Sequence, residues 1–214
     1  MHGRFLNIDS LIFDMDGTLW NATESYAQVW NATCADFGIE AHFTGRDLEQ
    51  FMGMSISDIM SHLLGGHMGV DNRLFLQELE RHEYEMMPRL GGVLYPNVIA
   101  GLESLRSSYS LFLLSNCSSR GLVNFVNVTS TQHLFKGLLT QGERPVSKCD
   151  NLLYMKQRYR LSAPAYVGDT QADCDQAHKA GIPFIFVEWG FGTCVNPDWS
   201  FSSFEMLEQE LLRL

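Results

Sequence analysis

The sequence lacks the patterns that define several large classes of protein. None of its hydrophobic runs approaches the roughly 20 residues that a membrane-spanning helix needs, and residues 1–10 lack the apolar stretch of a secretory signal. Its five cysteines are scattered and contain no C-x-x-C pair, so they indicate neither a disulfide framework nor a zinc site. We therefore expect a protein of the reducing cytoplasm that has no membrane partner.

Positive charge is scarce as well. The chain has 15 Lys and Arg residues against 25 Asp and Glu residues, which gives a net charge of −10. A field of this sign repels a polyanion, so nucleic acid is not an expected partner. A small anionic substrate remains compatible with it, because a bound metal ion can reverse the sign of the field within one site. The sequence carries no signal for the oligomeric state.

The 214 residues, of which 45% are hydrophobic, are enough for a folded α/β core that carries a smaller insert. Short apolar runs alternate with helical patterns along most of the chain. The runs predict strands at 10–14, 111–115, 165–168 and 184–187, with a weaker strand at 137–140, and the patterns predict helices at 98–107, 120–126, 148–159 and 171–180. This alternation predicts a doubly wound parallel sheet, a Rossmann-like α/β core.

A helical segment interrupts the alternation after the first strand. Residues 22–87 contain successive helical patterns, including helices expected at 47–52, 56–64 and 72–87. We therefore expect a core domain of residues 1–19 and 91–214 and an all-helical cap domain of residues 20–90. An insert at the carboxyl end of the first strand overhangs the crevice in which such sheets bind ligands, where a lid is useful.

The pair Asp14 and Asp16 follows the first predicted strand directly. Residues i and i+2 of an extended chain point to the same side, so their carboxylates converge at the edge of the sheet. Such a pair is usually stabilised by a divalent cation. A calcium loop is not indicated, because Gly17 comes two positions too early and the twelfth residue is Ser25 rather than Glu.

Further polar residues follow the later strands. Ser115 and Asn116 end the second strand before a helix that Ser118 or Ser119 is expected to cap, so a hydroxyl and free backbone N–H groups are available for phosphate oxygens. Lys148 begins a helix, a place where a cation opposes the helix dipole, so helix stability does not explain it.

Asp169 ends the fourth strand, and Asp173 lies one helical turn further on and faces the same spot. Two carboxylate pairs, a hydroxyl and a cation are the parts that metal-assisted phosphoryl transfer requires.

Four motifs in this order resemble the haloacid dehalogenase (HAD) superfamily, in particular its phosphatase branch with a helical cap. The matching motifs are DMDGT at 14–18, LLSN at 113–116, SK at 147–148 and VGDTQAD at 167–173. Within that branch, the phosphoglycolate phosphatase-like group looks most similar by the lengths of cap and core and by KAGIPFIFVEWGFG at 179–192. The resemblance implies a Mg²⁺-dependent phosphatase that acts on a small phosphorylated metabolite.

The resemblance implies roles for the first two aspartates. Asp14 would be the nucleophile that forms an aspartyl-phosphate, with its other oxygen on Mg²⁺. Asp16 would be the general acid for the leaving alkoxide and then the base for the attacking water, and its backbone carbonyl would also bind the metal.

The resemblance also implies roles for the later motifs. Ser115, Asn116 and Lys148 would hold the phosphoryl group, with Lys148 offsetting its charge. Asp169 would bind Mg²⁺, and Asp173 would support the metal directly or through a bound water.

The same motifs leave alternatives open. A sugar phosphomutase of the same superfamily would return the phosphoryl group to a second hydroxyl. A phosphonate hydrolase would need a cap lysine, and residues 20–90 contain none. A non-enzymatic phospho-acceptor module of the receiver type also combines an Asp, a hydroxyl and a Lys, but it has no helical insert. Relatives often place a substrate-contacting Arg within residues 44–54; we interpret Arg46 as a solvent-exposed helix residue rather than a site residue.

Overall fold

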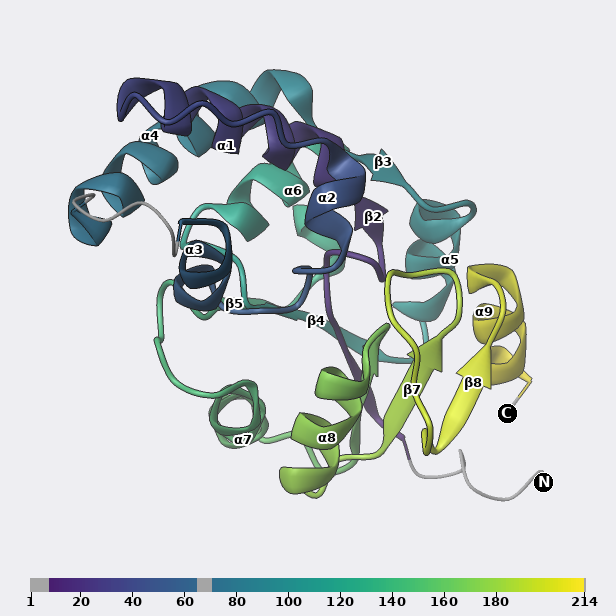
Figure 1. Ribbon diagram of the computed structural model, residues 1–214. Helices are drawn as coiled ribbons and strands as arrows, with labels where there is room; N and C mark the ends of the chain where they lie inside the picture. The colour runs from purple at the N-terminus through teal and green to yellow at the C-terminus, as the bar shows by residue number, and fades with distance from the viewer. Residues whose placement is uncertain (1–7, 65–70, 214) are drawn as a thin grey trace.

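The computed structural model describes residues 8–64 and 71–213. Its centre is a six-stranded parallel sheet with the strand order β5-β4-β1-β6-β7-β8 (Figure 1). The strands are β1 (Ser10–Phe13), β4 (Ser110–Ser115), β5 (Gly137–Thr140), β6 (Pro164–Gly168), β7 (Phe184–Val187) and β8 (Trp199–Phe201). Strand β1 lies between β4 and β6, with Phe13 beside Leu113 and Val167, so the ends of these three strands share one edge of the sheet.

Helices cover both faces of the sheet (Figure 1). Alternate strand residues point to opposite faces: Leu11 and Phe13 belong to one hydrophobic cluster and Ile12 to the other. The first cluster includes α5 (Val98–Leu105) and α9 (Phe204–Leu212), and the second includes α7 (Lys148–Arg158) and α8 (Gln171–Lys179). The predicted doubly wound α/β sheet is therefore confirmed.

The cap is formed by α1 (Thr23–Asp36), α2 (Gly45–Glu49), α3 (Ile56–Leu64) and α4 (Asn72–Leu90). It connects to the core through an antiparallel pair, β2 (Trp20–Asn21) and β3 (Val93–Leu94). Within the cap, the ring of Phe75 lies 5.7 Å from that of Trp30 and 5.1 Å from that of Phe37, which joins α4 to the end of α1. The predicted helical insert is confirmed, and it lies beyond the strand ends (Figure 1).

The structure contains elements that the sequence analysis did not assign. Strand β8 has three residues, only one of them buried, so it carries too little hydrophobic pattern to be recognised. The pair β2 and β3 is shorter still. Helix α9 does carry a helical pattern, since Phe204, Leu207 and Leu211 are all buried at spacings of three and four residues.

Two helix ends differ from expectation. Helix α4 runs to Leu90 rather than to residue 87, with Pro88 in its last turn, where the missing N–H removes one hydrogen bond at a helix that is about to end. Helix α6 (Gly121–Thr129) begins after Arg120 and has no side-chain cap, so the expected cap by Ser118 or Ser119 was wrong. The Ser118 hydroxyl instead donates to Glu83 of the cap. In the part of the chain that the structure describes, no helix combines the length and apolarity needed to cross a membrane.

Helix α9 offers a direct test of the core. Leu207 is fully buried and its neighbour Met206 is 52% exposed. We expect Leu207→Ala to lower the free energy of unfolding by about 2–4 kcal/mol, because the truncation leaves a cavity under the sheet. Met206→Ala should change it by no more than about 0.5 kcal/mol. Urea denaturation measures both, and equal losses would contradict the packing of α9.

Candidate active site

The buried side chain of Lys148 joins two aspartates that lie far apart in the sequence. Its Nζ atom lies 3.0 Å from Oδ1 of Asp14 and 2.6 Å from Oδ1 of Asp173, and all three side chains are almost completely buried. Asp14 is placed by β1, where its backbone N–H donates to Val167 O at 2.8 Å. Lys148 is placed by the start of α7, where the Ser147 side chain caps the helix as its position predicts.

Asp169 completes a group of three buried carboxylates. Oxygen atoms of Asp14, Asp169 and Asp173 all lie within 4.8 Å of one another. Burial raises the pKa of Asp14 to about 6, against the opposing effect of Lys148. Burial, followed by the charges of Asp173 and Asp14, raises the pKa of Asp169 well above its usual range. Three carboxylates around one ammonium are an oxygen-rich, electron-rich site, and this donor set fits a hard divalent cation.

Hydrogen bonds from the surrounding loops hold the later aspartates in place. The backbone N–H of Phe191 donates to Oδ2 of Asp169 at 2.8 Å, and the Thr18 hydroxyl lies 3.4 Å from its Oδ1. Asp173 forms a capping box with Thr170, whose hydroxyl lies 2.7 Å from Asp173 Oδ2. The second oxygen of Asp173 is thereby left for Lys148. Hydrogen bonds within the protein thus fix the positions of Asp169 and Asp173.

The Asp16 side chain lies outside this group. Its Oδ1 accepts a hydrogen bond from Trp20 Nε1 at 2.9 Å, and its Oδ2 lies 3.5 Å from the Tyr26 hydroxyl of α1. Desolvation within the pocket, followed by the charge of Asp14, raises the pKa of Asp16 to about 8. A carboxyl group that retains its proton at neutral pH can act as a proton donor.

Ser115 and Asn116 lie at the end of β4, beside Asp14. Ser115 is buried, and its Oγ accepts a hydrogen bond from the Cys117 N–H at 3.2 Å. The Asn116 side-chain NH₂ donates to Gly53 O at 2.7 Å, which links the core to the cap loop between α2 and α3. The other end of this amide, Oδ1, is buried and has no hydrogen-bond partner among the described residues.

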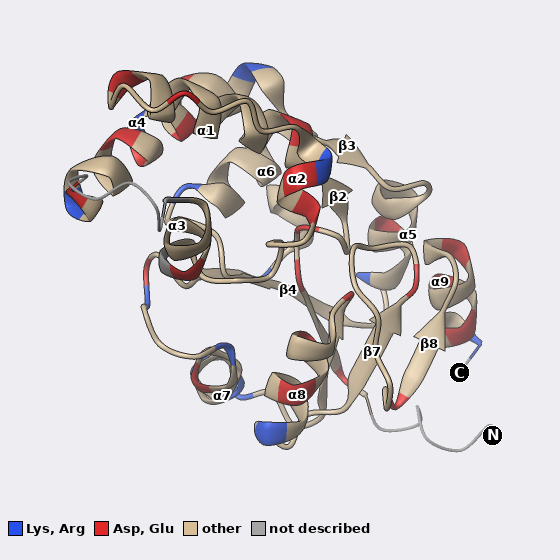
Figure 2. Ribbon diagram, viewed as in Figure 1, with Lys and Arg blue, Asp and Glu red and all other residues tan. Residues whose placement is uncertain are grey.

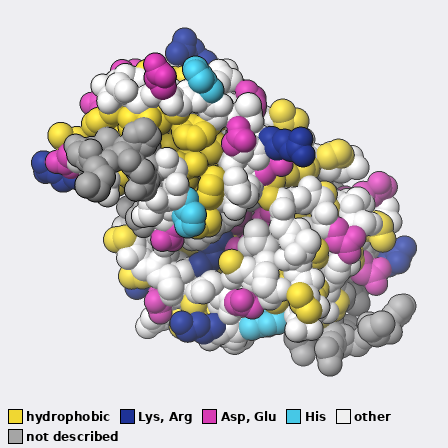
Figure 3. Space-filling model, viewed as in Figure 1, with side chains coloured by type: hydrophobic (Ala, Val, Ile, Leu, Met, Phe, Trp, Pro, Cys, Tyr) yellow, Lys and Arg dark blue, Asp and Glu magenta, His cyan; other side chains and the backbone are white. Residues whose placement is uncertain are grey.

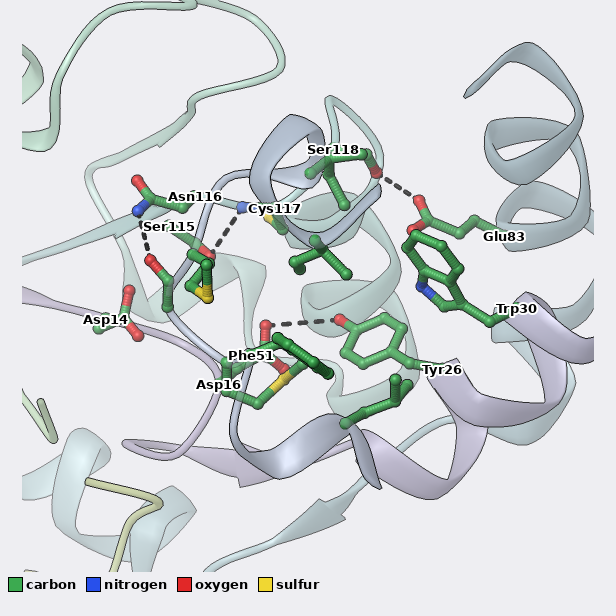
Figure 4. Close-up of a pocket in the computed structure, with 16 residues that line it drawn as sticks. Asp14, Asp16, Tyr26, Trp30, Phe51, Glu83, Ser115, Asn116, Cys117 and Ser118 are labelled. Atoms are coloured by element: carbon green, nitrogen blue, oxygen red, sulfur yellow. Dashed lines mark hydrogen bonds between the residues drawn. The ribbon is translucent and has the colours of Figure 1, made fainter. Parts of the chain in front are cut away.

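A cavity of about 50 Å³ lies between the cap and the strand ends (Figure 4). Asp14, Asp16, Ser115 and Asn116 line its core side. The cap supplies mainly apolar and aromatic side chains, including Tyr26, Trp30, Leu48, Phe51, Ile56 and Ile59. Lys148, Asp169 and Asp173 are not among the lining residues, but Lys148 contacts Asp14, which is. The core therefore supplies polar side chains to the cavity, and the cap supplies mainly apolar walls.

Two polar residues of the site were not predicted from the sequence. The hydroxyl of Tyr166 lies 3.3 Å from Oδ1 of Asp14 and 3.4 Å from Oδ1 of Asp173, but an aromatic residue within an apolar strand gives no signal of such a contact. Glu83 is buried on α4 and faces the cavity. A signal for it was present: it is an acid within the buried stripe of Phe75, Leu79 and Met87, at spacings of four residues.

Charge elsewhere on the molecule is dispersed. Figure 2 shows acidic segments on most of the helices as well as in the middle of the molecule, and basic segments at separate places between them. On the face shown in Figure 3, basic side chains form separate spots among acidic ones. Arg46 is exposed and does not line the cavity, which confirms its interpretation as a solvent-exposed residue.

The close approach of Gly17 to Asp169 can be tested with a matched glycine. Gly17 has φ +82°, and a Cβ atom there would lie 2.1 Å from Asp169 Oδ2, whereas Gly38 has φ +66° with nothing within 4 Å. Alanine at either position adopts an unfavourable left-handed conformation. We expect Gly17→Ala to lower the free energy of unfolding by about 1–3 kcal/mol more than Gly38→Ala, because only the former collides. Equal losses in denaturant unfolding would show that the carboxylate is not held there.

The burial of Glu83 predicts a pH-dependent stability. Burial raises its pKa from 4.5 to about 7, against the hydrogen bond from Ser118. The folded state therefore favours the protonated acid, and stability is lost as pH rises from about 4.5 to about 7. Glu83→Gln removes this loss, so its stability relative to the unmodified protein should rise by up to about 3 kcal/mol between about pH 5 and pH 8. Urea denaturation at each pH, with a metal chelator present, measures the free energies of unfolding. The exposed Glu80→Gln is the control. If the difference in free energy of unfolding between Glu83→Gln and the unmodified protein did not change with pH, the burial of Glu83 would be contradicted.

Comparison with known proteins shows to which family this chain is similar. The family model for haloacid dehalogenase-like hydrolases matches residues 11–187. The phosphoglycolate phosphatase of Synechococcus elongatus is 29% identical over 200 residues, covering 90% of this chain and 92% of the relative. That of Haemophilus influenzae is 27% identical over 212 residues, covering 91% and 94%.

The fold comparison agrees. A haloacid dehalogenase-like family hydrolase of Streptococcus pneumoniae superposes with a TM-score of 0.74 at 20% identity, over 94% of this chain and 96% of that one. A likeness at this identity shows the fold. The resemblance drawn from the four motifs, including that to the phosphatase branch, is confirmed, and the chain belongs to the haloacid dehalogenase-like hydrolase family.

Proposed function

We propose that the protein is a phosphomonoester hydrolase that acts on a small metabolite through an aspartyl-phosphate on Asp14, with Mg²⁺ as cofactor. The observation that carries the proposal is the contact of Lys148 with both Asp14 and Asp173 inside a buried carboxylate group at the edge of the sheet. The relatives named phosphoglycolate phosphatase support the reaction class. Membership of a hydrolase family argues against the non-enzymatic phospho-acceptor alternative.

The residues at the mouth of the site supply the two chemical steps. In the first, an Asp14 oxygen attacks phosphorus, the bond from phosphorus to the leaving oxygen breaks, and Asp16 gives that oxygen its proton. In the second, the ionised Asp16 takes a proton from water, whose oxygen attacks phosphorus and releases phosphate and the Asp14 carboxylate. The raised pKa of Asp16, about 8, suits the first of these roles.

Neighbouring groups would hold the transferring phosphoryl group. Lys148 carries a positive charge that is stabilised by its two carboxylate partners; burial opposes that charge, but Asp14 and Asp173 outweigh it and raise the lysine pKa. The Ser115 hydroxyl and the backbone N–H groups after β4 can donate to phosphate oxygens. The Asn116 NH₂ is engaged by Gly53, so a direct side-chain contact with phosphate requires that cap contact to break.

The donor set of the carboxylate group is suited to Mg²⁺, which prefers oxygen ligands and keeps several waters. The side chains of Asp14 and Asp169 and the backbone carbonyl of Asp16 would hold it, with Asp173 acting directly or through a water. When bound, Mg²⁺ supplies positive charge that reduces repulsion between the phosphate and the aspartates.

The domain boundaries and the cellular location are part of the same proposal. Core segments 1–19 and 91–214 and a cap of 20–90 agree with the position of the β2–β3 pair, which begins at Trp20 and ends at Leu94. The odd number and scattered positions of the five cysteines support a reducing compartment such as the cytoplasm.

Two carboxamide variants test the mechanism. Asp14→Asn should lower kcat by at least about 1,000-fold, because the amide cannot attack phosphorus. Asp16→Asn should accumulate a phosphoenzyme, because the variant can still be phosphorylated by esters with good leaving groups but cannot activate water. Release of inorganic phosphate and the intact protein mass measure the two effects.

The exposed Asp175→Asn on α8 is the control and should retain turnover. Full activity of Asp14→Asn would overturn the proposal. Return of the phosphoryl group to a second hydroxyl of the substrate, rather than to water, would favour the phosphomutase alternative.

A further inference from the structure

The end of the cavity farthest from Asp14 carries an acidic side chain, and no basic side chain is among the described lining residues. Figure 4 shows Glu83 and Trp30 at that end and Asp14 at the other. Of the described residues that line the cavity, none is Lys, Arg or His, whereas three are acidic: Asp14, Asp16 and Glu83. Asp14 and Asp16 belong to the chemistry at phosphorus. Glu83 is therefore the charged group that the leaving part of a substrate meets.

The same cavity contains a buried acceptor without a donor. The Oδ1 atom of Asn116 is buried and has no partner among the described residues, since the NH₂ of this amide donates to Gly53 O. The Ser118 hydroxyl donates to Oε2 of Glu83, whose carboxylate also lines the cavity. Buried acceptors without a donor are unfavourable, so a ligand that brings hydroxyl groups stabilises the site.

The size of the cavity limits the ligand further. A volume of about 50 Å³ holds a few water molecules, at about 10–15 Å³ for each. Apolar cap side chains such as Phe51 and Ile59 form the remaining wall and exclude further water. Since this volume includes the space beside Asp14 and Ser115 that the phosphate would occupy, only a small leaving group is compatible with it.

We propose that this cavity selects phosphomonoesters whose leaving group is small, uncharged and hydroxyl-bearing, and that Glu83 is a specificity residue that accepts the hydroxyl and excludes carboxylate esters. The inference rests on the proposed phosphatase function. Above pH 7, where Glu83 is ionised, a carboxylate placed at this end would be desolvated beside it without a described cation to compensate it, and neither carboxylate would donate a hydrogen bond. The selectivity thus differs from the carboxylate-bearing substrate in the name of the phosphoglycolate phosphatase relatives.

The experiment compares substrates that share a skeleton and differ in one group. One pair is glycerol 3-phosphate and 3-phosphoglycerate, and the other is 2-hydroxyethyl phosphate and 2-phosphoglycolate. At pH 8, above the Glu83 pKa of about 7, and with Mg²⁺ present, we expect kcat/KM to be at least about 10-fold higher for the hydroxyl member of each pair. Equal or higher kcat/KM for the carboxylate members overturns the inference while leaving the phosphatase function intact.

A near-isosteric variant assigns the selectivity to one side chain. Glu83→Gln removes the charge and keeps an oxygen acceptor for Ser118. It should shift the ratio of kcat/KM toward the carboxylate member by at least about 10-fold. The control Glu80→Gln, exposed on the same helix, should leave the ratio unchanged. An unchanged ratio in Glu83→Gln overturns the role of this residue.

Two further arms separate the causes of failure. The ratio in the unmodified protein needs no variant, so the inference is judged even if Glu83→Gln does not fold. If no ester is hydrolysed, the proposed function fails, and dissociation constants of the paired esters for Asp14→Asn then decide the selectivity. Binding of the carboxylate member at least about 10-fold more weakly supports it, and equal or tighter binding overturns it.

Discussion

The buried ammonium of Lys148 is the interaction on which the rest of the site depends. Asp14, Asp169 and Asp173 lie within 4.8 Å of one another, in surroundings where burial alone raises the pKa of an aspartate. One lysine between Asp14 and Asp173 allows these carboxylates to remain close without water. A buried ion pair of this kind contributes little net stability, but it fixes geometry, because either partner alone would be a costly uncompensated charge. The excess of negative charge that remains is what suits the site to a cation.

Rigid supports make this arrangement possible. Asp14 follows the central strand, Lys148 begins a helix that Ser147 caps, and Asp173 is held by its capping box with Thr170. Because each side chain is positioned by a regular element or its cap, the protein itself fixes the geometry of the group, and such preorganisation lowers the reorganisation that a reaction needs. The parallel sheet brings these elements together at one edge, where its strands end.

The cap adds a different property, since its side chains form the wall of the cavity opposite Asp14. Besides the contact of Tyr26 with Asp16, two hydrogen bonds from the segment after β4 join it to the core: Asn116 donates to Gly53 O, and Ser118 donates to Glu83. Asn116 and Ser118 both follow β4, so the segment after the strand beside Asp14 also contacts the cap. One short segment, residues 115–118, thus contributes to the cavity lining and contacts the cap.

The sequence by itself determined the sheet, the helical insert and the residues gathered at the strand ends, because these features are local. Period-two and period-3.6 patterns reveal elements, and polar residues after apolar runs reveal strand ends. Helix α9 was visible in the same way but was not assigned, and β8 was too short to leave a pattern. Only the tertiary structure decided which side chains meet. It turned Asp16 toward Trp20 and Tyr26, brought Tyr166 to Asp14, and placed Glu83 in the cavity. Those contacts depend on how distant elements pack, which no local pattern encodes.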